Sequence, residues 1–258
     1  METNINNIID ALDKIAPFET AEEWDNVGLI VGDRFSKVKK VLISLDITEK
    51  LIEKAIKSNC NTIIAHHPII FAPQSSITTD SQLGKNLIRA IKNDINIISY
   101  HTNYDKAPKG TNYWLAKKLE LENIRQIIKE DCQYVFVGEK NFKNIDSLKA
   151  YISDKLEMPI ELIKLYGKKP KTINKISVVG GSGIDFMDIA KNESDLLITA
   201  DIKHHDGQRA YENNFFIVDA SHHYTEIHGI KGLKKLLEKD FKEVEFALYE
   251  DLEYMVVE

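Results

Sequence analysis

The chain has 258 residues, of which 43% are hydrophobic and 29% charged, a balance typical of a globular protein with a substantial buried core. Its net charge of −6 argues against a dominant nucleic-acid surface, which needs clustered Lys and Arg, but is compatible with a pocket for one nucleotide. Its two cysteines, Cys60 and Cys132, lie far apart in the sequence, which excludes a thiolate metal site and a disulfide framework and favours the reducing cytoplasm.

The N-terminal segment predicts an amphipathic helix rather than a targeting sequence. Apolar residues recur there at helical spacing and stop before a proline: Ile5, Ile8, Ile9, Leu12, Ile15 and Pro17. The segment lacks the basic start and the long apolar run of a signal peptide. No apolar run in the chain reaches the length of a membrane span, so we expect no membrane partner.

Strands alternate with helices over the first half of the chain. The run "KKVLISLDIT" (39–48) predicts a buried strand, and residues 48–59 predict a helix that Thr48 can cap. "TIIAHHP" then predicts a second strand, which Pro68 ends. A helix and the strand "INIISYH" follow within 83–105, and 112–121 predicts a further helix. This order is typical of parallel strands that are buried on both faces.

The second half repeats the order of the first. Residues 174–206 predict a strand, a glycine turn, a helix and a strand, and they end on paired histidines as the first half does. We therefore predict an α/β protein of two similar lobes, with mostly parallel sheets flanked by helices. The first lobe would comprise 1–125 joined by the C-terminal segment 215–258, and the second 126–214. Residues 137–175 would add a helix, a strand at 160–166 and the basic turn "GKKPK", which is expected to be a solvated loop rather than a phosphate site.

Three polar clusters follow predicted strands. The first is the pair His66 and His67, the second is "YHTNYD" with His101 and Asp105, and the third is "FFIVDASHHYTE", which holds Asp219, His222, His223 and Glu226. In open α/β sheets, ligands bind beyond the carboxyl ends of the strands. The clusters offer imidazoles and carboxylates without thiolates, the ligand set for zinc, iron, manganese, cobalt or nickel.

The same residues suit two ions better than one. Two adjacent imidazoles at an irregular strand end before Pro68 can diverge onto two ions, and a carboxylate can bridge them. Such two-metal sites hold their ions roughly 3.5–4 Å apart and activate water for hydrolysis. A helix that begins near Ser221 would set His222 and Glu226 one turn apart on one face.

Five motifs that stretch from residue 22 to residue 226 resemble, as an ordered set, those of the NIF-three-like, or DUF thirty-four, family. They are "EEWDNVGLIVGD", "IIAHHPIIF", "SYHTNYD", "TADIKHHD" and "DASHHYTE". Members of that family are often labelled GTP cyclohydrolase I type 2 homologues. The resemblance implies two α/β lobes around a dinuclear metal cleft, two divalent ions per chain and assembly as a toroidal homohexamer.

The family's metal ligands fall on five residues of this chain. The resemblance implies that they are His66, His67, Asp105, His222 and Glu226. The family usually reads Gly-His-Tyr or Gly-His-Phe where this chain reads Ser221-His222-His223. The four-residue spacing to Glu226 selects His222, and a register shift to His223 stays open.

Other polar residues have two interpretations each. His101 would either orient a ligand or move a proton near the metals, or be a packed histidine behind them. Asp46 would do likewise or simply precede a helix cap. His204 and His205 would lie either at the cleft or, as we favour, on the surface.

Two further motifs favour structural roles. In "WDNVGL", Trp24 is expected to pack while Asp25 and Asn26 bond to backbone in a turn, with a wall of the cleft as the alternative. The glycine turn Gly180–Gly183 lacks a Walker A lysine and a full dinucleotide fingerprint, so we favour a tight structural turn over a phosphate site.

Two functions compete for this set of residues. The first is a metal-dependent hydrolase acting on a small-molecule substrate, for which the family label names GTP and the opening of a cyclic amidine C–N bond. The second is a non-enzymatic metal-binding or metal-trafficking protein. A metallophosphatase is weaker, because its usual Asn-His-Asp/Glu element is absent from the sequence.

Overall fold

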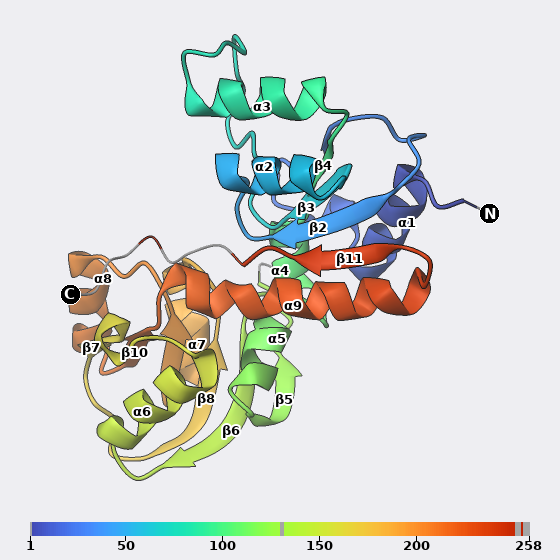
Figure 1. Ribbon diagram of the computed structural model, residues 1–258. Helices are drawn as coiled ribbons and strands as arrows, with labels where there is room; N and C mark the ends of the chain where they lie inside the picture. The colour runs from blue at the N-terminus through green and yellow to red at the C-terminus, as the bar shows by residue number, and fades with distance from the viewer. Residues whose placement is uncertain (1, 130–131, 251–253, 255–258) are drawn as a thin grey trace. The chain divides into compact units, whose positions relative to one another are not determined.

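The computed structural model describes residues 2–129, 132–250 and 254 (Figure 1). The helices in this part of the chain are α1 (Ile5–Ile15), α2 (Glu49–Lys57), α3 (Gln82–Lys92), α4 (Thr102–Lys106), α5 (Thr111–Lys118), α6 (Ile145–Leu156), α7 (Met187–Glu193), α8 (His204–Glu212) and α9 (His222–Asp240). Short 3₁₀ turns lie at η1 (Phe18–Thr20), η2 (Ile160–Leu162) and η3 (Ile184–Phe186). The strands are β1 (Gly28–Val31), β2 (Lys40–Ser44), β3 (Thr62–Ala65), β4 (Asn96–Ser99), β5 (Glu122–Gln126), β6 (Phe136–Phe142), β7 (Lys164–Gly167), β8 (Ile173–Val178), β9 (Leu196–Thr199), β10 (Phe216–Asp219) and β11 (Glu245–Leu248).

The chain forms two compact units, each with its own sheet and helices. Unit 1 takes the described residues of Met1–Tyr104 and Ile230–Leu252, and unit 2 takes those of Asp105–Gly229 and Glu253–Glu258. The chain therefore leaves unit 1 within α4 and returns to it within α9. The predicted α/β class with two helix-flanked sheets is confirmed.

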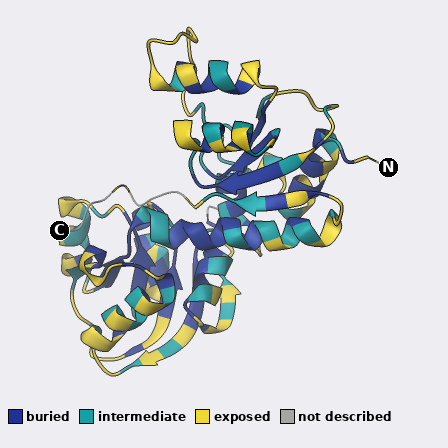
Figure 2. Ribbon diagram, viewed as in Figure 1, coloured by how far each residue is buried: buried dark blue, intermediate teal, exposed yellow. Residues whose placement is uncertain are grey.

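The sheet of unit 1 has the strand order β1-β4-β3-β2-β11. Its neighbours pair in parallel except β1 and β4, which are antiparallel. Every residue of β3 and β4 is buried, as expected for strands with both faces covered (Figure 2). The parallel strands β2 and β3 end next to each other, and the segments that follow them carry polar residues of the candidate site.

Helix α2 shows why the first βαβ unit forms where the sequence predicts it. The Thr48 side chain accepts the backbone N–H of Leu51 at 3.2 Å and so caps the helix. Leu51, Ile52 and Ala55 are fully buried on one face of α2, which contributes to the apolar core of unit 1. Helix α3 lies beside α2, as Figure 1 shows.

The sheet of unit 2 has the order β5-β6-β8-β9-β10-β7 and is mixed. The central strands β8, β9 and β10 are parallel, whereas β5–β6, β6–β8 and β10–β7 pair antiparallel. The expectation of mostly parallel strands therefore holds for unit 1 but not for unit 2. The reason is that β6 and β7 flank the parallel strands and run in the opposite direction. Strand β7 also starts later than the strand predicted at 160–166, at Lys164 after the turn η2.

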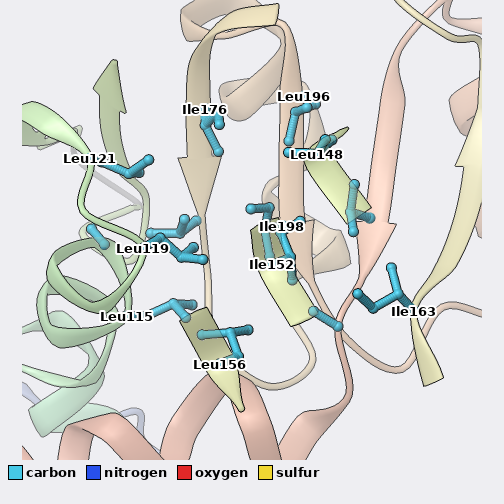
Figure 3. Packing of buried hydrophobic residues seen from close by; sticks show 14 of the residues in the cluster. Leu115, Leu119, Leu121, Leu148, Ile152, Leu156, Ile163, Ile176, Leu196 and Ile198 are labelled. Atoms are coloured by element: carbon cyan, nitrogen blue, oxygen red, sulfur yellow. The ribbon is translucent and has the colours of Figure 1, made fainter. Parts of the chain in front are cut away.

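Helix α6 and the sheet of unit 2 enclose an apolar core. Figure 3 shows Ile152 of α6 beside Ile198 of β9, and Leu148 and Leu156 of the same helix and Ile176 of β8 belong to the same apolar cluster. Each of these five side chains is at most 1% exposed. This core supports the strands β9 and β10, whose carboxyl ends lead to the candidate site residues of unit 2.

The division between the units differs from the boundaries expected from the sequence, which fell at residues 125/126 and 214/215. Helix α5 packs on β5, β6 and β8, so the chain joins unit 2 some twenty residues earlier than expected. Strand β10 pairs with β9 and β7 and therefore belongs to unit 2, not to the segment that returns to the first lobe. Both differences arise because pairing partners far apart in the sequence decide the sheet to which a segment belongs.

Among the described residues, no helix combines the length and the apolar character that crossing a membrane requires.

Candidate metal centre

The adjacent histidines of unit 1 lie just beyond the end of β3. Their backbone N–H groups extend the hydrogen bonding between β3 and β2. The N–H of His66 donates to the carbonyl oxygen of Ser44 at 3.1 Å, and that of His67 donates to the carbonyl oxygen of Leu45 at 2.9 Å. The two imidazole centroids are 5.0 Å apart and the rings are inclined by 53°. Neighbouring side chains that would alternate within a strand thus lie close together here.

An oxygen atom fixes the orientation of each ring. Nδ1 of His66 lies 3.0 Å from the carbonyl oxygen of Tyr100, and Nδ1 of His67 lies 2.9 Å from Oδ1 of Asp46. A carbonyl or an ionised carboxylate can only accept, so each Nδ1 carries the hydrogen, and Nε2 is the nitrogen of each ring that could bind a metal ion. The interpretation of Asp46 as a partner of the site, rather than only a residue before the α2 cap, is the one that the structure favours.

His101 joins this pair from the end of β4. Its ring centroid is 5.1 Å from that of His66 and 5.5 Å from that of His67. One ring nitrogen from each of the three histidines lies within 4.8 Å of the others, a spacing that could hold a metal ion. His66 is buried, whereas the other two rings are partly exposed, so solvent reaches one side of the cluster.

Asp25 holds His101 in place. Its Oδ1 lies 2.9 Å from Nδ1 of His101, and its Oδ2 accepts from the backbone N–H and the hydroxyl of Thr102 at 3.0 and 2.5 Å. Burial raises the pKa of Asp25, but the hydrogen bonds from His101 and Thr102 outweigh it and hold the pKa at about 2. Asp25 is therefore a fixed negative charge behind the imidazole.

In unit 2, helix α9 begins at His222, as expected, and sets Glu226 one turn further along. Nε2 of His222 lies 3.1 Å from Oε2 of Glu226, and Nδ1 of His222 lies 2.6 Å from Oδ2 of Asp201. Glu226 is only 4% exposed. The neighbouring His223 ring instead lies 5.1 Å from the ring of Tyr224. The geometry supports the register in which His222 shares a face with Glu226.

Two carboxylates surround the His222 imidazole, and they set its charge. Burial lowers the pKa of His222, but the negative charge of Glu226 and the hydrogen bond to Asp201 outweigh this and raise the pKa to about 11. Both ring nitrogens then donate, one to each carboxylate. The arrangement attracts positive charge, as a cation site must.

The glycine turn after β8 makes room for Glu226. Gly181 has φ +60, which strains other residues, and a Cβ on it would clash with Oε1 of Glu226, so a side chain there would displace that carboxylate. The turn's backbone N–H groups donate within the chain, to Asn112 Oδ1, Thr225 Oγ1 and Thr199 Oγ1. These hydrogen bonds favour the structural interpretation of the turn.

Asp105 lies on the short helix α4, four residues after His101, and is partly buried. Its backbone carbonyl accepts from the Asn112 side chain at 3.2 Å. Asp219 ends β10 and is 8% exposed, with a carboxylate that accepts from the backbone N–H groups of Ser221 and Ile202.

The remaining histidine pair does not follow a strand directly. His204 and His205 open helix α8 and are exposed, and in the described chain they join no group of side chains spaced to hold a metal. The surface interpretation is thus the one that fits. Lys168 and Lys169 of the "GKKPK" turn are also exposed, and Lys168 bonds to Asn214.

Sequence reasoning missed two carboxylates and placed one aromatic residue wrongly. Asp201 was not singled out, although it follows β9 at the sheet edge that Asp219 shares, a position that could have identified it. Asp25 was expected to bond to backbone in a turn, with a wall of the cleft as the alternative, and its contact with His101 was not predicted. Trp24, expected to pack, is 58% exposed, although its ring lies beside those of Phe71 and His101.

The chain was compared with known proteins. The family profile Duf34/NIF3 (NGG1p interacting factor 3) matches residues 3–252. A Clostridium perfringens protein named GTP cyclohydrolase 1 type 2 homolog is 35% identical, with 95% of each chain covered. A Clostridium acetobutylicum protein of the same name is 33% identical, over 92% of this chain and 91% of its own. The crystal structure of Staphylococcus aureus protein SA1388 superposes with a TM-score of 0.89 at 30% identity, covering 96% of this chain and 97% of that one.

Proposed function

The chain belongs to the Duf34/NIF3 family, and on that premise we propose that it is a dinuclear divalent-metal protein and a metal-dependent hydrolase. One observation supports the metal most directly: three imidazoles converge in unit 1, with one ring nitrogen of each close enough to hold an ion together, and a protein oxygen holds Nδ1 of each ring.

The ligand set we propose is the one implied by the family resemblance. It comprises His66, His67, Asp105, His222 and Glu226. The contact between His222 and Glu226 fits it, because an imidazole and a buried carboxylate 3.1 Å apart can share a cation in place of a proton. Glu226 is proposed as the bridging carboxylate. Nitrogen and oxygen donors without thiolate suit zinc, iron, manganese, cobalt or nickel.

The hydrolase assignment rests on the donor set and on the relatives' printed name, GTP cyclohydrolase 1 type 2 homolog. A divalent ion with an open position lowers the pKa of bound water toward neutrality. In this chain, Asp46 and Asp25 would orient His67 and His101, and His101 would accept or deliver a proton at its Nε2. The substrate class that we propose is a small molecule with a hydrolysable cyclic amidine bond, including nucleotides.

Two properties of the working protein accompany this proposal. By resemblance to the family, we propose a homo-oligomer, with a hexamer as the first expectation, which sedimentation would measure. We also propose a cytoplasmic location, since both cysteines are free and buried in the structure.

The test pairs metal content with turnover on the same samples. Protein stripped with a chelator and reloaded with each candidate metal is assayed for hydrolysis of GTP, other nucleotides and pterins. His67→Ala should lose bound metal and any turnover together, and His204→Ala, from the exposed pair, should keep both. Metal loss in His67→Ala with no turnover in any reloaded parent sample would favour the alternative, a non-enzymatic metal-binding or metal-trafficking protein. Equal metal content in the two variants would contradict the site itself.

A further inference from the structure

Two aromatic rings next to the imidazoles of unit 1 face solvent. Trp24 is 58% exposed and Phe71 is 60% exposed. Their centroids are 5.6 Å apart with the rings inclined by 48°, and the Trp24 ring meets the His101 ring edge-on at 6.1 Å. Leaving large apolar faces in water is unfavourable, so a pair of them beside a candidate metal centre suggests a ligand that covers them.

Buried polar contacts hold the segments that carry both rings. Asp25, which follows Trp24, has a side chain with no exposed surface and binds His101 and Thr102. Asn26 donates from Nδ2 to the carbonyl oxygen of Ile70 at 2.7 Å, which ties this segment to the residue before Phe71. The rings are thus fixed relative to each other and to His101, and a ligand that binds there needs little reorganisation of the protein.

We propose that Trp24 and Phe71 form a stacking platform for the planar aromatic ring of a heterocyclic ligand, such as a nucleobase. Aromatic side chains stack on any base, since every base has a π face. The platform would hold the ring of the substrate beside His101. This inference deepens the proposed function, on which it rests for the identity of the histidine cluster as the reaction site.

The size of the exposed surface favours a small ligand over a second protein. An aromatic side chain has a surface of roughly 150–250 Å², so two rings that are about 60% exposed offer at most roughly 300 Å². A stable protein interface needs about 800 Å² from each partner. A single heterocycle, by contrast, matches two neighbouring rings in extent.

Trp24 itself can report the binding. The sequence holds two tryptophans, Trp24 and Trp114, so the Trp114→Phe protein emits from Trp24 alone. Adenosine and guanosine monophosphates are the probes, and ribose 5-phosphate is the control without a ring. We expect saturable quenching by both nucleotides and none by ribose 5-phosphate. Absence of saturable quenching at millimolar nucleotide would overturn the platform.

Two variants in the same background localise the effect. Phe71→Ala should weaken nucleotide binding about tenfold, the scale of one lost stacking contact. Phe35→Ala removes another exposed phenylalanine, 82% exposed, and should leave binding unchanged. Calorimetric titration of the parent and of Trp24→Ala gives an independent readout that needs no change at Trp114. Equal nucleotide affinities of the parent and Trp24→Ala would contradict the proposal. So would self-association of the parent protein that Phe71→Ala abolishes.

The same titrations separate this inference from the proposed function. Each is repeated on chelator-stripped and metal-loaded protein. Quenching in a protein that binds no metal would leave the platform standing and reject the metal centre. Normal metal loading without quenching would reject the platform alone.

Discussion

Oδ2 of Asp201 lies 2.6 Å from Nδ1 of His222, the relationship that Asp46 has with His67 and Asp25 with His101. Three aspartates, each distant in sequence from its histidine, thus fix one nitrogen of an imidazole. The other nitrogen of His222 lies 3.1 Å from Oε2 of Glu226. Partners of this kind set ring orientation and ligand basicity in metal sites.

The first prediction concerns these supporting aspartates. Asp46→Asn and Asp201→Asn should each weaken metal binding by about 10- to 100-fold, because the ring that each holds loses its orientation and its charge partner. Asp80→Asn is the control, because the Asp80 carboxylate is exposed and accepts a hydrogen bond from the hydroxyl of Thr78 rather than from a histidine. Competition titration against a chromophoric chelator measures all three. Unchanged affinity in both site variants would show that the contacts are incidental.

A second prediction follows from Gly181. A methyl group at this position would meet Oε1 of Glu226 at 2.2 Å, so Gly181→Ala should displace Glu226 and lower metal affinity at least tenfold. Gly28→Ala is the matched control, because Gly28 also has a positive φ but nothing within 4 Å of the added carbon. Both variants should lose some thermal stability from backbone strain, and only Gly181→Ala should lose metal. Equal metal content in the two would argue against a role for Glu226.

The third prediction separates His222 from His223. His222→Ala should lose at least one ion per chain, because its Nε2 lies beside Glu226, whereas His223→Ala should keep near-parental metal content. Elemental analysis of the two purified proteins decides between them. Metal loss in His223→Ala but not in His222→Ala would show that His223, not His222, is the metal ligand.

The pH dependence of stability tests Asp25. Its pKa is lowered from 3.8 to about 2 in the folded protein, so the ionised carboxylate stabilises the fold above the ordinary value, and this contribution is lost as the pH falls through that interval. The free energy of unfolding of the parent should therefore decrease by on the order of 2 kcal/mol more than that of Asp25→Asn between neutral pH and about pH 2. Urea unfolding of both proteins measures the difference. Identical pH profiles would contradict the assignment.

Local signals in the sequence were sufficient to predict several parts of this structure. The Thr48 cap and the apolar face of α2 follow from residues within one or two turns. The contact between His222 and Glu226 follows from helical spacing once α9 begins at His222. The position of His66 and His67 beyond a strand follows from the β-branched run and Pro68.

Features that depend on distant partners could not be predicted in the same way. The antiparallel position of β7 beside β10 joins segments some fifty residues apart, and neither segment carries a pattern that reveals its partner. The contact between Asp25 and His101 spans 76 residues, whereas a turn motif suggests only local bonds. The ring of Trp24, predicted to pack, is 58% exposed, a feature that the local turn motif does not reveal.

The measurement that tests the central claim most directly is the metal stoichiometry of the parent and of Glu226→Gln after identical loading. Glu226 is proposed to touch both ions, and glutamine keeps its shape while removing the charge that offsets two dications. The account predicts two ions per chain in the parent, loss of both together in Glu226→Gln, and loss mainly of one in Asp105→Asn. A parent that binds no metal after loading with zinc, manganese or iron, or a Glu226→Gln protein that keeps two ions, would contradict it.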